Sequence, residues 1–397
     1  MKTPSQLNKE ERDTVISYES SESHYLLLTP GPLTTSSQVR QAMMLDWCTW
    51  DEDYKALTEG IRNDLISLAK ASPSLYTSVL MQGSGTFAVE SVIGSVMPPE
   101  GKLLIGANGA YGERMVEIAA TLRIDHIAMV ESHVTPLSPA RLDRYLMEHP
   151  DITHVAFVHG ETTSGMLNPL EELCRVAKQH HRTLIVDAMS TFGGIPINVE
   201  ALDIDFVVSS SNKCLQGVPG FGYVIAKRSA IEQTNSWARS LSLNLYDQWN
   251  TMEKTQGKWR YTSPTHTVHA LSTAMKELQE EGGIEARYQR YKNNHRVLVE
   301  GMKALGFMPV LPPELQGPII TSFHYPIGEA GTAFDFALFY EGMKKEGFVI
   351  YPGKLTDADT FRVGTIGHVF PDDMHRFIHA VKQVMKQQQG SECVLSD

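Results

Sequence analysis

Short apolar runs alternate with amphipathic stretches from about residue 77 to residue 227. The apolar runs are rich in β-branched residues and read TSVLMQ, KLLIGA, THVAFVHG, TLIVDAM, DFVVSSS and GYVIAK. Apolar residues recur at helical spacing in segments between several of them, namely ERMVEIAATL, PARLDRYLMEH and PLEELCRVAKQHH. Strand–helix–strand repetition of this kind predicts a mostly parallel sheet that is covered by helices on both faces.

The pattern changes in the last third of the chain. Helical spacing predicts helices over about 267–281 and 283–305, and Gly282-Gly283 is a helix-ending signal between them. Farther on, three strand-like runs alternate with two helical segments; the runs are ITSFHYP, FVIYPG and FRVGTIG, and the segments lie near 333–346 and 371–387. This mixture predicts a smaller α+β unit.

The chain is therefore expected to have an α/β fold with two domains and a short extension. Residues 1–23 are polar and rich in Ser and Glu, which is typical of a mobile N-terminal extension. We expect the large domain to span 24–265 and the small C-terminal domain to span 266–397.

Composition and charge exclude several classes of partner. The formal net charge is −11 and the pI is about 5.8, whereas proteins that coat nucleic acid or anionic membranes are normally basic. No apolar run reaches the ~18 residues of a membrane helix, and the polar start MKTPSQLNKEERDT does not resemble a signal peptide, so a cytoplasmic location is expected. The cysteines Cys48, Cys174, Cys214 and Cys393 form no C-x-x-C pair, so neither a disulfide framework nor a metal site is predicted.

A glycine-rich turn follows the first strand of the alternating region. The segment 82–86 reads QGSGT and precedes a helical run, and the free N–H groups at a helix N-terminus attract phosphate. Gly83-x-Gly85-x-x-Ala88 also fits a loose dinucleotide fingerprint, but the next strand runs into Asn108-Gly109 without the expected acid. The turn thus favours a phosphate site over a nicotinamide site, with a plain tight turn as the alternative.

Two charged residues stand at the ends of later strands. Asp187 ends LIVD, at the usual ligand position of a parallel sheet, although a helix cap or ion pair would also explain it. Lys213 follows DFVVSSS, where burial would lower its pKa and make it a nucleophile toward carbonyls; a surface lysine is the alternative. A phosphate-binding turn, an acid for a ring nitrogen and a buried lysine are together the groups that hold pyridoxal 5'-phosphate.

Several ordered motifs carry a resemblance to a known family. They are LLLTPGPLTTS, QGSGTFAVES, NGAYGERM, HGETTSGMLNP, VDAMSTFGG, SSSNKCLQGVPGFGYVIA, GKWRYTSPTHTV, VIYPGK and FRVGTIG. From about Tyr25 to about Val384 the chain resembles the fold-type I, class V aminotransferases, which depend on pyridoxal phosphate. The resemblance implies a large domain with a mostly parallel, seven-stranded type of sheet and a smaller C-terminal domain.

The resemblance also implies roles for residues around the cofactor. Lys213 matches the lysine that binds the cofactor covalently and shuttles protons, and Asp187 matches the partner of the ring nitrogen. Tyr111 matches the aromatic residue that stacks on the ring, and Thr162 matches the hydroxyl near the 3′-oxygen.

Further roles concern the phosphate, the substrate and a second subunit. Arg362 matches the arginine that binds the substrate carboxylate, and Gly31 lies in the segment that lines the substrate mouth. Thr262 matches a residue that reaches the phosphate in the neighbouring subunit, which implies a homodimer with shared active sites. The phosphate-binding turn corresponds to Ser84, Gly85 and Thr86.

Within the family, the motifs are most similar to those of enzymes that act on an aminophosphonate. The expected reaction moves the amine of 2-aminoethylphosphonate to pyruvate, which yields phosphonoacetaldehyde and L-alanine in phosphonate catabolism. One alternative is a sister aminotransferase that uses alanine or serine with glyoxylate or pyruvate. Alternatives of other classes are a nicotinamide-dependent oxidoreductase and a ligand-binding module without catalysis.

Overall fold

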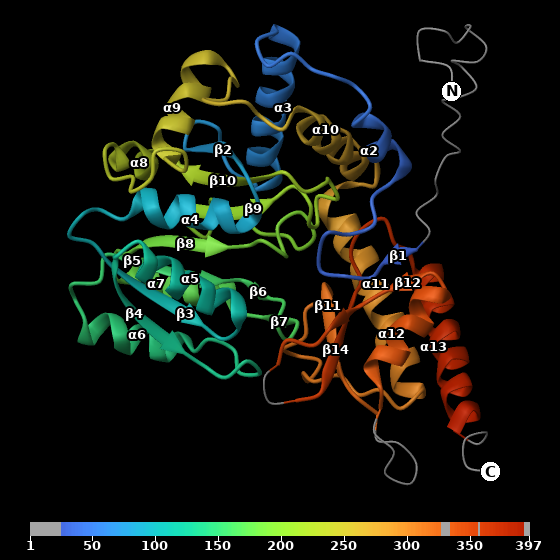
Figure 1. Ribbon diagram of the computed structural model, residues 1–397. Helices are drawn as coiled ribbons and strands as arrows, with labels where there is room; N and C mark the ends of the chain where they lie inside the picture. The colour runs from blue at the N-terminus through green and yellow to red at the C-terminus, as the bar shows by residue number, and fades with distance from the viewer. Residues whose placement is uncertain (1–24, 327–333, 356–357, 393–397) are drawn as a thin grey trace, which may run out of the picture.

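A computed structural model describes residues 25–326, 334–355 and 358–392 of the chain. The predicted extension 1–23 lies outside the described residues. Figure 1 shows a larger body around a central sheet, joined to a smaller body that carries most of the C-terminal elements.

The central sheet has seven strands in the order β2-β10-β9-β8-β5-β3-β4. Their bounds are Tyr76–Gln82 (β2), Phe221–Lys227 (β10), Phe206–Ser210 (β9), Thr183–Asp187 (β8), His154–Val158 (β5), Lys102–Ala107 (β3) and Asp125–Val130 (β4). β10 is antiparallel to both of its neighbours, and all other pairings are parallel. The predicted mostly parallel sheet is thus confirmed.

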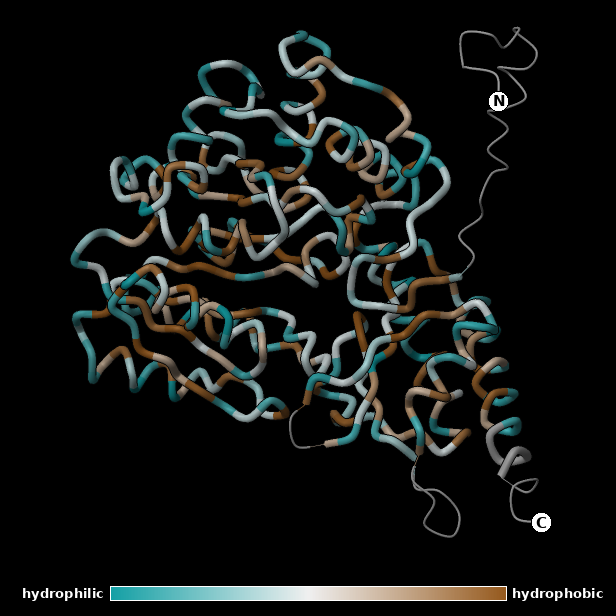
Figure 2. Tube along the Cα trace, in the orientation of Figure 1, coloured by the Kyte–Doolittle hydropathy of each residue, from teal (hydrophilic) through white to brown (hydrophobic). Residues whose placement is uncertain are grey.

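Both faces of this sheet are covered. Every residue of β5 and β9 is buried, as expected where helices pack on both faces. The strands run as apolar bands through the larger body in Figure 2. The edge strand β4 was missed by the sequence pattern because it is only partly buried and mixes polar with apolar residues.

Helices of the larger body connect and cover the strands. α4 packs on β9 and β10, α5 on β3 and β4, and α7 on β8. The helical bounds are Ser37–Ala42 (α2), Glu52–Leu68 (α3), Gly85–Val96 (α4), Ala110–Thr121 (α5), Pro139–Glu148 (α6), Leu170–Gln179 (α7), Arg228–Ile231 (α8), Leu245–Thr255 (α9) and Thr265–Glu280 (α10), with a short 3-10 turn at Glu232–Thr234. A small hairpin, Gly160–Glu161 (β6) with Met166–Leu167 (β7), follows β5.

The smaller body has its own apolar core. A three-stranded antiparallel sheet, β11-β14-β13, packs with three helices. The bounds are Gly283–Ala304 (α11), Ile320–His324 (β11), Phe336–Lys345 (α12), Phe348–Val349 (β12), Tyr351–Pro352 (β13), Thr360–Gly364 (β14) and Pro371–Glu392 (α13). The N-terminal strand β1 (Leu26–Leu27) pairs with β12 and brings Leu28 into this core.

One helix lies on the other side of the expected division at residue 265. α10 places Val268, Leu271 and Met275 in the core of the larger body, whereas α11 supplies Leu298 and Met302 to the smaller core. The apolar face of α10 thus packs on the sheet-bearing body, although residues 266–397 were expected to form the small domain.

Candidate active site

Asp187 stands at the end of β8, and its side chain is almost completely buried. One carboxylate oxygen accepts a hydrogen bond of 2.8 Å from the backbone N–H of Met189, and no other hydrogen bond from a described residue reaches the group. Burial raises the pKa of Asp187 to about 7, and the charge of Glu161 adds to the rise. The Met189 N–H and the cations Lys213 and Arg114 oppose it. A cationic N–H donor beside this carboxylate would therefore be strongly stabilised.

Lys213 lies just beyond the end of β9 and faces the N-terminal segment of the chain. Its Nζ donates a hydrogen bond of 3.0 Å to the carbonyl oxygen of Pro30. A Cβ at Gly31 would lie only 2.7 Å from Lys213 Nζ, so glycine leaves the space that the lysine occupies. Burial lowers the pKa of Lys213, and the charge of Arg362 adds to this effect. The structure thus places Gly31 against Lys213, and the charge of Asp187 also acts on Lys213.

Tyr111, in the first turn of α5, is surrounded by cations. Burial alone would raise the pKa of its phenol, but a hydrogen bond with Thr162 and the charges of Lys213, Lys354 and Arg362 outweigh burial and lower it. The guanidinium carbon of Arg114 lies 5.0 Å from the ring centroid, and Lys354 Nζ lies 4.9 Å from it. The phenol therefore stands in a positive electrostatic environment.

The predicted phosphate-binding turn forms the N-terminus of α4. Ser84 is the N-cap residue but makes no capping hydrogen bond with its side chain. A Cβ at Gly85 would lie 2.3 Å from the sulfur of Met189, so this glycine permits close approach between the turn and the end of β8. Arg114 Nη1 donates a hydrogen bond of 3.3 Å to Thr86 Oγ1, which adds a cation at the open helix end.

The N-terminus of α5, by contrast, is already occupied by side chains that are not among the predicted site residues. The fully buried Glu161 accepts hydrogen bonds from the backbone N–H groups of Tyr111 (3.3 Å) and Gly112 (3.4 Å). Thr163 Oγ1 accepts a hydrogen bond from the backbone N–H of Ala110. The same hydroxyl donates a hydrogen bond of 2.7 Å to the other carboxylate oxygen of Glu161. An acidic residue shortly after the buried strand β5, within HGETTSG, was the signal that could have revealed Glu161.

Arg362, in β14, extends from the smaller body into the site. Its side chain is 3% exposed. Nε donates to the carbonyl oxygen of Pro352 and Nη1 to that of Thr162, each at 3.0 Å. Nη2 makes no hydrogen bond to a described residue, and no acidic side chain among the described residues pairs with the guanidinium. The free edge of this cation can bind an anion.

Thr262 is not part of this cluster within one chain. It is exposed, next to the exposed Tyr261, and no described contact connects it with Lys213 or Asp187. Arg260 donates to the hydroxyl of Tyr261 and to the carbonyl oxygen of Leu241, whose side chain is 77% exposed. Arg260, two residues before Thr262, is thus hydrogen-bonded to two exposed residues, Tyr261 and Leu241.

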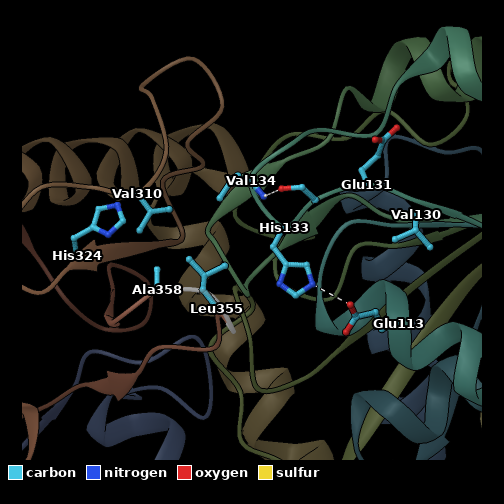
Figure 3. Close-up of a pocket in the computed structure, with 10 residues that line it drawn as sticks. Glu113, Val130, Glu131, His133, Val134, Val310, His324, Leu355 and Ala358 are labelled. Carbon is cyan, nitrogen blue, oxygen red and sulfur yellow. Dashed lines mark hydrogen bonds and ion pairs between the residues drawn. The ribbon is translucent and has the colours of Figure 1, made fainter.

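A cavity of about 520 Å³ lies between the two bodies, beside the site rather than in it. Figure 3 shows that it is lined by residues from the segment after β4, including His133 and Val134, and by Val310, His324 and Leu355 of the smaller body. His133 is hydrogen-bonded to Glu113 at 2.9 Å. None of the predicted site residues lines this cavity.

The fold and the residue cluster agree with comparisons to known proteins. Residues 48–338 match the family described as aminotransferase class-V. The chain belongs to the class V aminotransferase family. This aminotransferase is 56% identical over 360 residues to a 2-aminoethylphosphonate–pyruvate transaminase of Bacteroides fragilis (strain YCH46), covering 90% of the chain and 98% of the relative.

Another sequence relative and a solved structure are also similar to this aminotransferase over most of its length. A 2-aminoethylphosphonate–pyruvate transaminase of Bacillus cytotoxicus is 55% identical over 363 residues, covering 91% of the chain and 98% of the relative. The crystal structure of an alanine–glyoxylate aminotransferase from Nostoc sp. superposes with a TM-score of 0.81 at 27% identity, covering 91% and 95% of the two chains. No helix in the described part of the chain has the length and apolar character to cross a membrane.

Proposed function

We propose that this aminotransferase transfers the amine of 2-aminoethylphosphonate to pyruvate, yielding phosphonoacetaldehyde and L-alanine in the cytoplasm. The observation that carries the proposal is the set of 2-aminoethylphosphonate–pyruvate transaminases that are 55–56% identical over nearly their whole length. The cluster of Lys213, Asp187 and Arg362 would supply a nucleophile, a buried acid and a free cation for such a reaction.

The residues of the cluster fit pyridoxal 5'-phosphate as the cofactor. The uncapped N-terminus of α4 at Ser84, Gly85 and Thr86 offers N–H groups to a phosphate, whereas the N-terminus of α5 is filled by Glu161. Asp187, with a raised pKa and one free oxygen, suits a protonated ring nitrogen. When bound, the cofactor would supply a carbonyl for the amine and an electron-withdrawing ring.

The side chains of the chain then have separate tasks. Lys213, whose pKa burial lowers, would bind the cofactor covalently and move the proton between substrate carbon and cofactor. Tyr111 would stack on the ring, and the Thr162 hydroxyl would contact its 3′-oxygen. Arg362 would bind the anionic end of each substrate with its free edge, while Gly31 keeps the space beside Lys213 open.

A second copy of the chain would complete each site. Thr262 has no described contact with Lys213 within one chain, and the nearby Arg260 is hydrogen-bonded to the exposed residues Tyr261 and Leu241. Apolar surface of this kind favours burial against a partner. We infer a homodimer in which Thr262 reaches the phosphate of the neighbouring subunit. Sedimentation should find a dimer, and a fully active monomer would contradict this.

A donor and acceptor screen tests the proposed reaction. The holoenzyme is mixed with 2-aminoethylphosphonate and pyruvate, and L-alanine is measured, with alanine–glyoxylate and serine–glyoxylate as competing pairs. Faster turnover of either competing pair would favour the sister aminotransferase. A nicotinamide-dependent oxidoreductase is disfavoured because the residue after β3 is not an acid: Asn108 is buried there and hydrogen-bonded to Asn168.

A further inference from the structure

Lys354 is a cation of the active-site surroundings that the reaction described above does not use. Its Nζ lies 4.9 Å from the centroid of the Tyr111 ring. The side chain is exposed, and no acidic side chain of the described residues forms an ion pair with it. Its charge and that of Arg362 both act on the Tyr111 phenol and lower its pKa.

The backbone before Lys354 is tied to the strand that carries Arg362. Tyr351 pairs with Arg362 in the sheet, and the carbonyl oxygen of Pro352 accepts the Nε hydrogen bond of Arg362. The N–H of Gly353 donates to the carbonyl oxygen of Thr360 at 2.9 Å. The lysine therefore follows a segment whose position is fixed relative to the guanidinium, and the two cations belong to one unit of the small body.

The proposed substrates differ in the charge that these cations must bind. A phosphonate carries up to two negative charges and three oxygens, whereas the carboxylate of pyruvate or alanine carries one charge and two oxygens. The planar edge of Arg362 matches two oxygens, and an ammonium group is a compact cation suited to a third. The net charge of the chain is −11, so its overall field repels a dianion. The attraction for the phosphonate must therefore come from cations close to the site.

We propose that Lys354 is a specificity-determining residue that binds the phosphonate of the amine donor together with Arg362, whereas the carboxylate of the acceptor binds through Arg362 alone. This inference rests on the proposed function and names the group that distinguishes its two substrates. Lys354 is then the reason why one pocket accepts a dianion and a monoanion in turn.

Equilibrium binding of unreactive anions tests the proposal directly. Ethylphosphonate and propionate are titrated calorimetrically into the holoenzyme and into Lys354→Met. We expect ethylphosphonate to bind about tenfold more weakly to the variant, a loss of about 1.4 kcal/mol. Propionate should change by less than about twofold, because its carboxylate needs only Arg362. Lys354→Arg should restore most of the phosphonate affinity, since it keeps the charge.

Lys292→Met is the matched control. Lys292 is another exposed lysine over a tyrosine ring, with its Nζ 4.6 Å from the centroid of Tyr288 on α11. Its removal changes the net charge equally, and neither anion should bind differently. Single-turnover half-reactions should agree with the titrations: Lys354→Met should raise the half-saturating concentration of 2-aminoethylphosphonate and leave that of L-alanine unchanged.

Two results would overturn the inference. Equal loss of ethylphosphonate and propionate affinity would mean that Lys354 has no preference for phosphonate, and unchanged ethylphosphonate binding would place Lys354 outside the pocket. Failure of the proposed function would be seen separately, because the parent enzyme would then not convert 2-aminoethylphosphonate at all. The ethylphosphonate titration decides on Lys354 in either case.

Discussion

Arg362 Nη1 donates a hydrogen bond of 3.0 Å to the carbonyl oxygen of Thr162. Arg362 belongs to β14 of the smaller body, whereas Thr162 follows β6 in the larger body, where its hydroxyl is hydrogen-bonded to Tyr111. The contact therefore fixes the cation that is proposed to bind the substrate relative to the ring that is proposed to stack on the cofactor. Because Nε is held by Pro352, only the remaining edge of the guanidinium is left for a ligand.

Arg362→Ala should weaken the binding of the amine donor and of the acceptor alike. Both anions use the guanidinium, which is almost completely buried, so each half-reaction should lose roughly 2–4 kcal/mol in kcat/KM. Arg362→Lys should recover only part of this loss, because an ammonium cannot hold Thr162, Pro352 and a two-oxygen anion together. Single-turnover kinetics with each substrate measure the effect, and a loss confined to one substrate would contradict the shared role.

Gly31→Ala should inactivate the enzyme without unfolding it. The added Cβ would lie 2.7 Å from both Cδ and Nζ of Lys213, so the lysine must move away from its position. Gly306→Ala is the matched control, since Gly306 also has a positive φ, of +88°, but no atom lies within 4 Å of its added Cβ. Both variants should lose about 1–2 kcal/mol of stability from backbone strain. Only Gly31→Ala should abolish turnover, and equal activities would show that the Lys213 position tolerates the shift.

Glu161→Gln should destabilise the first turn of α5. The carboxylate accepts backbone N–H groups through both oxygens, from Tyr111 and Gly112 on one and from Thr163 on the other. Whichever way a glutamine amide turns, its nitrogen faces one of these donors and cannot accept it. We expect a loss of about 1–3 kcal/mol in the free energy of unfolding. Removing this charge should also lower the pKa of Asp187. Urea denaturation measures the first effect, and unchanged stability would mean that water replaces the lost acceptor.

Lys213→Ala should remove amine transfer almost entirely while the fold persists. The proposed nucleophile and proton carrier are the same group, so the rate should fall by several powers of ten. The lost side chain donates one hydrogen bond, to Pro30, so stability should change little. Borohydride reduction of the parent holoenzyme followed by peptide mapping should find the cofactor on Lys213. A label on another lysine would refute the assignment.

Much of this architecture follows from local sequence pattern. The parallel strands are mostly apolar runs, and Asp187 and Lys213 stand out because each is a charge at or just beyond the end of such a run. β4 was missed because an edge strand needs little apolar surface, so its residues do not show a clear period. The place of α10 in the larger core was missed as well, since a helix pattern shows that one face is buried but not which body covers it.

The polar framework of the site is less visible in the sequence. Glu161 and Tyr111 are 50 residues apart, and their contact depends on β3 and β5 being neighbours in the sheet. Lys354 has no local feature that distinguishes it from a surface lysine; only the fold brings it to the Tyr111 ring. Charge clusters assembled from distant segments therefore require the structure.

The pH dependence of stability should reveal the buried carboxyl group of Asp187. Folding raises its pKa from an ordinary value of 3.8 to about 7, chiefly through burial. Above the folded pKa, the native state must hold a buried negative charge that the unfolded chain holds in water, which costs stability. As the pH falls below about 7, the native state binds a proton at Asp187 that the unfolded chain does not bind, so the cost of the buried charge shrinks. This cost vanishes below the pKa that Asp187 has in the unfolded chain.

Asp187→Asn in the protein freed of cofactor should therefore be more stable than the parent near pH 8, by roughly 1–3 kcal/mol. The difference should become smaller toward pH 5, because the variant lacks the titrating group while its amide oxygen can still accept the Met189 N–H. Urea denaturation of both proteins at the two pH values measures this. Pyridoxal phosphate should reverse the order, since a protonated ring nitrogen beside the parent carboxylate stabilises its charge, and ligand binding adds to native stability. Parallel pH profiles for parent and variant would show that Asp187 stays ionised in the folded protein, and the proposed partnership with the ring nitrogen would then lose its electrostatic basis.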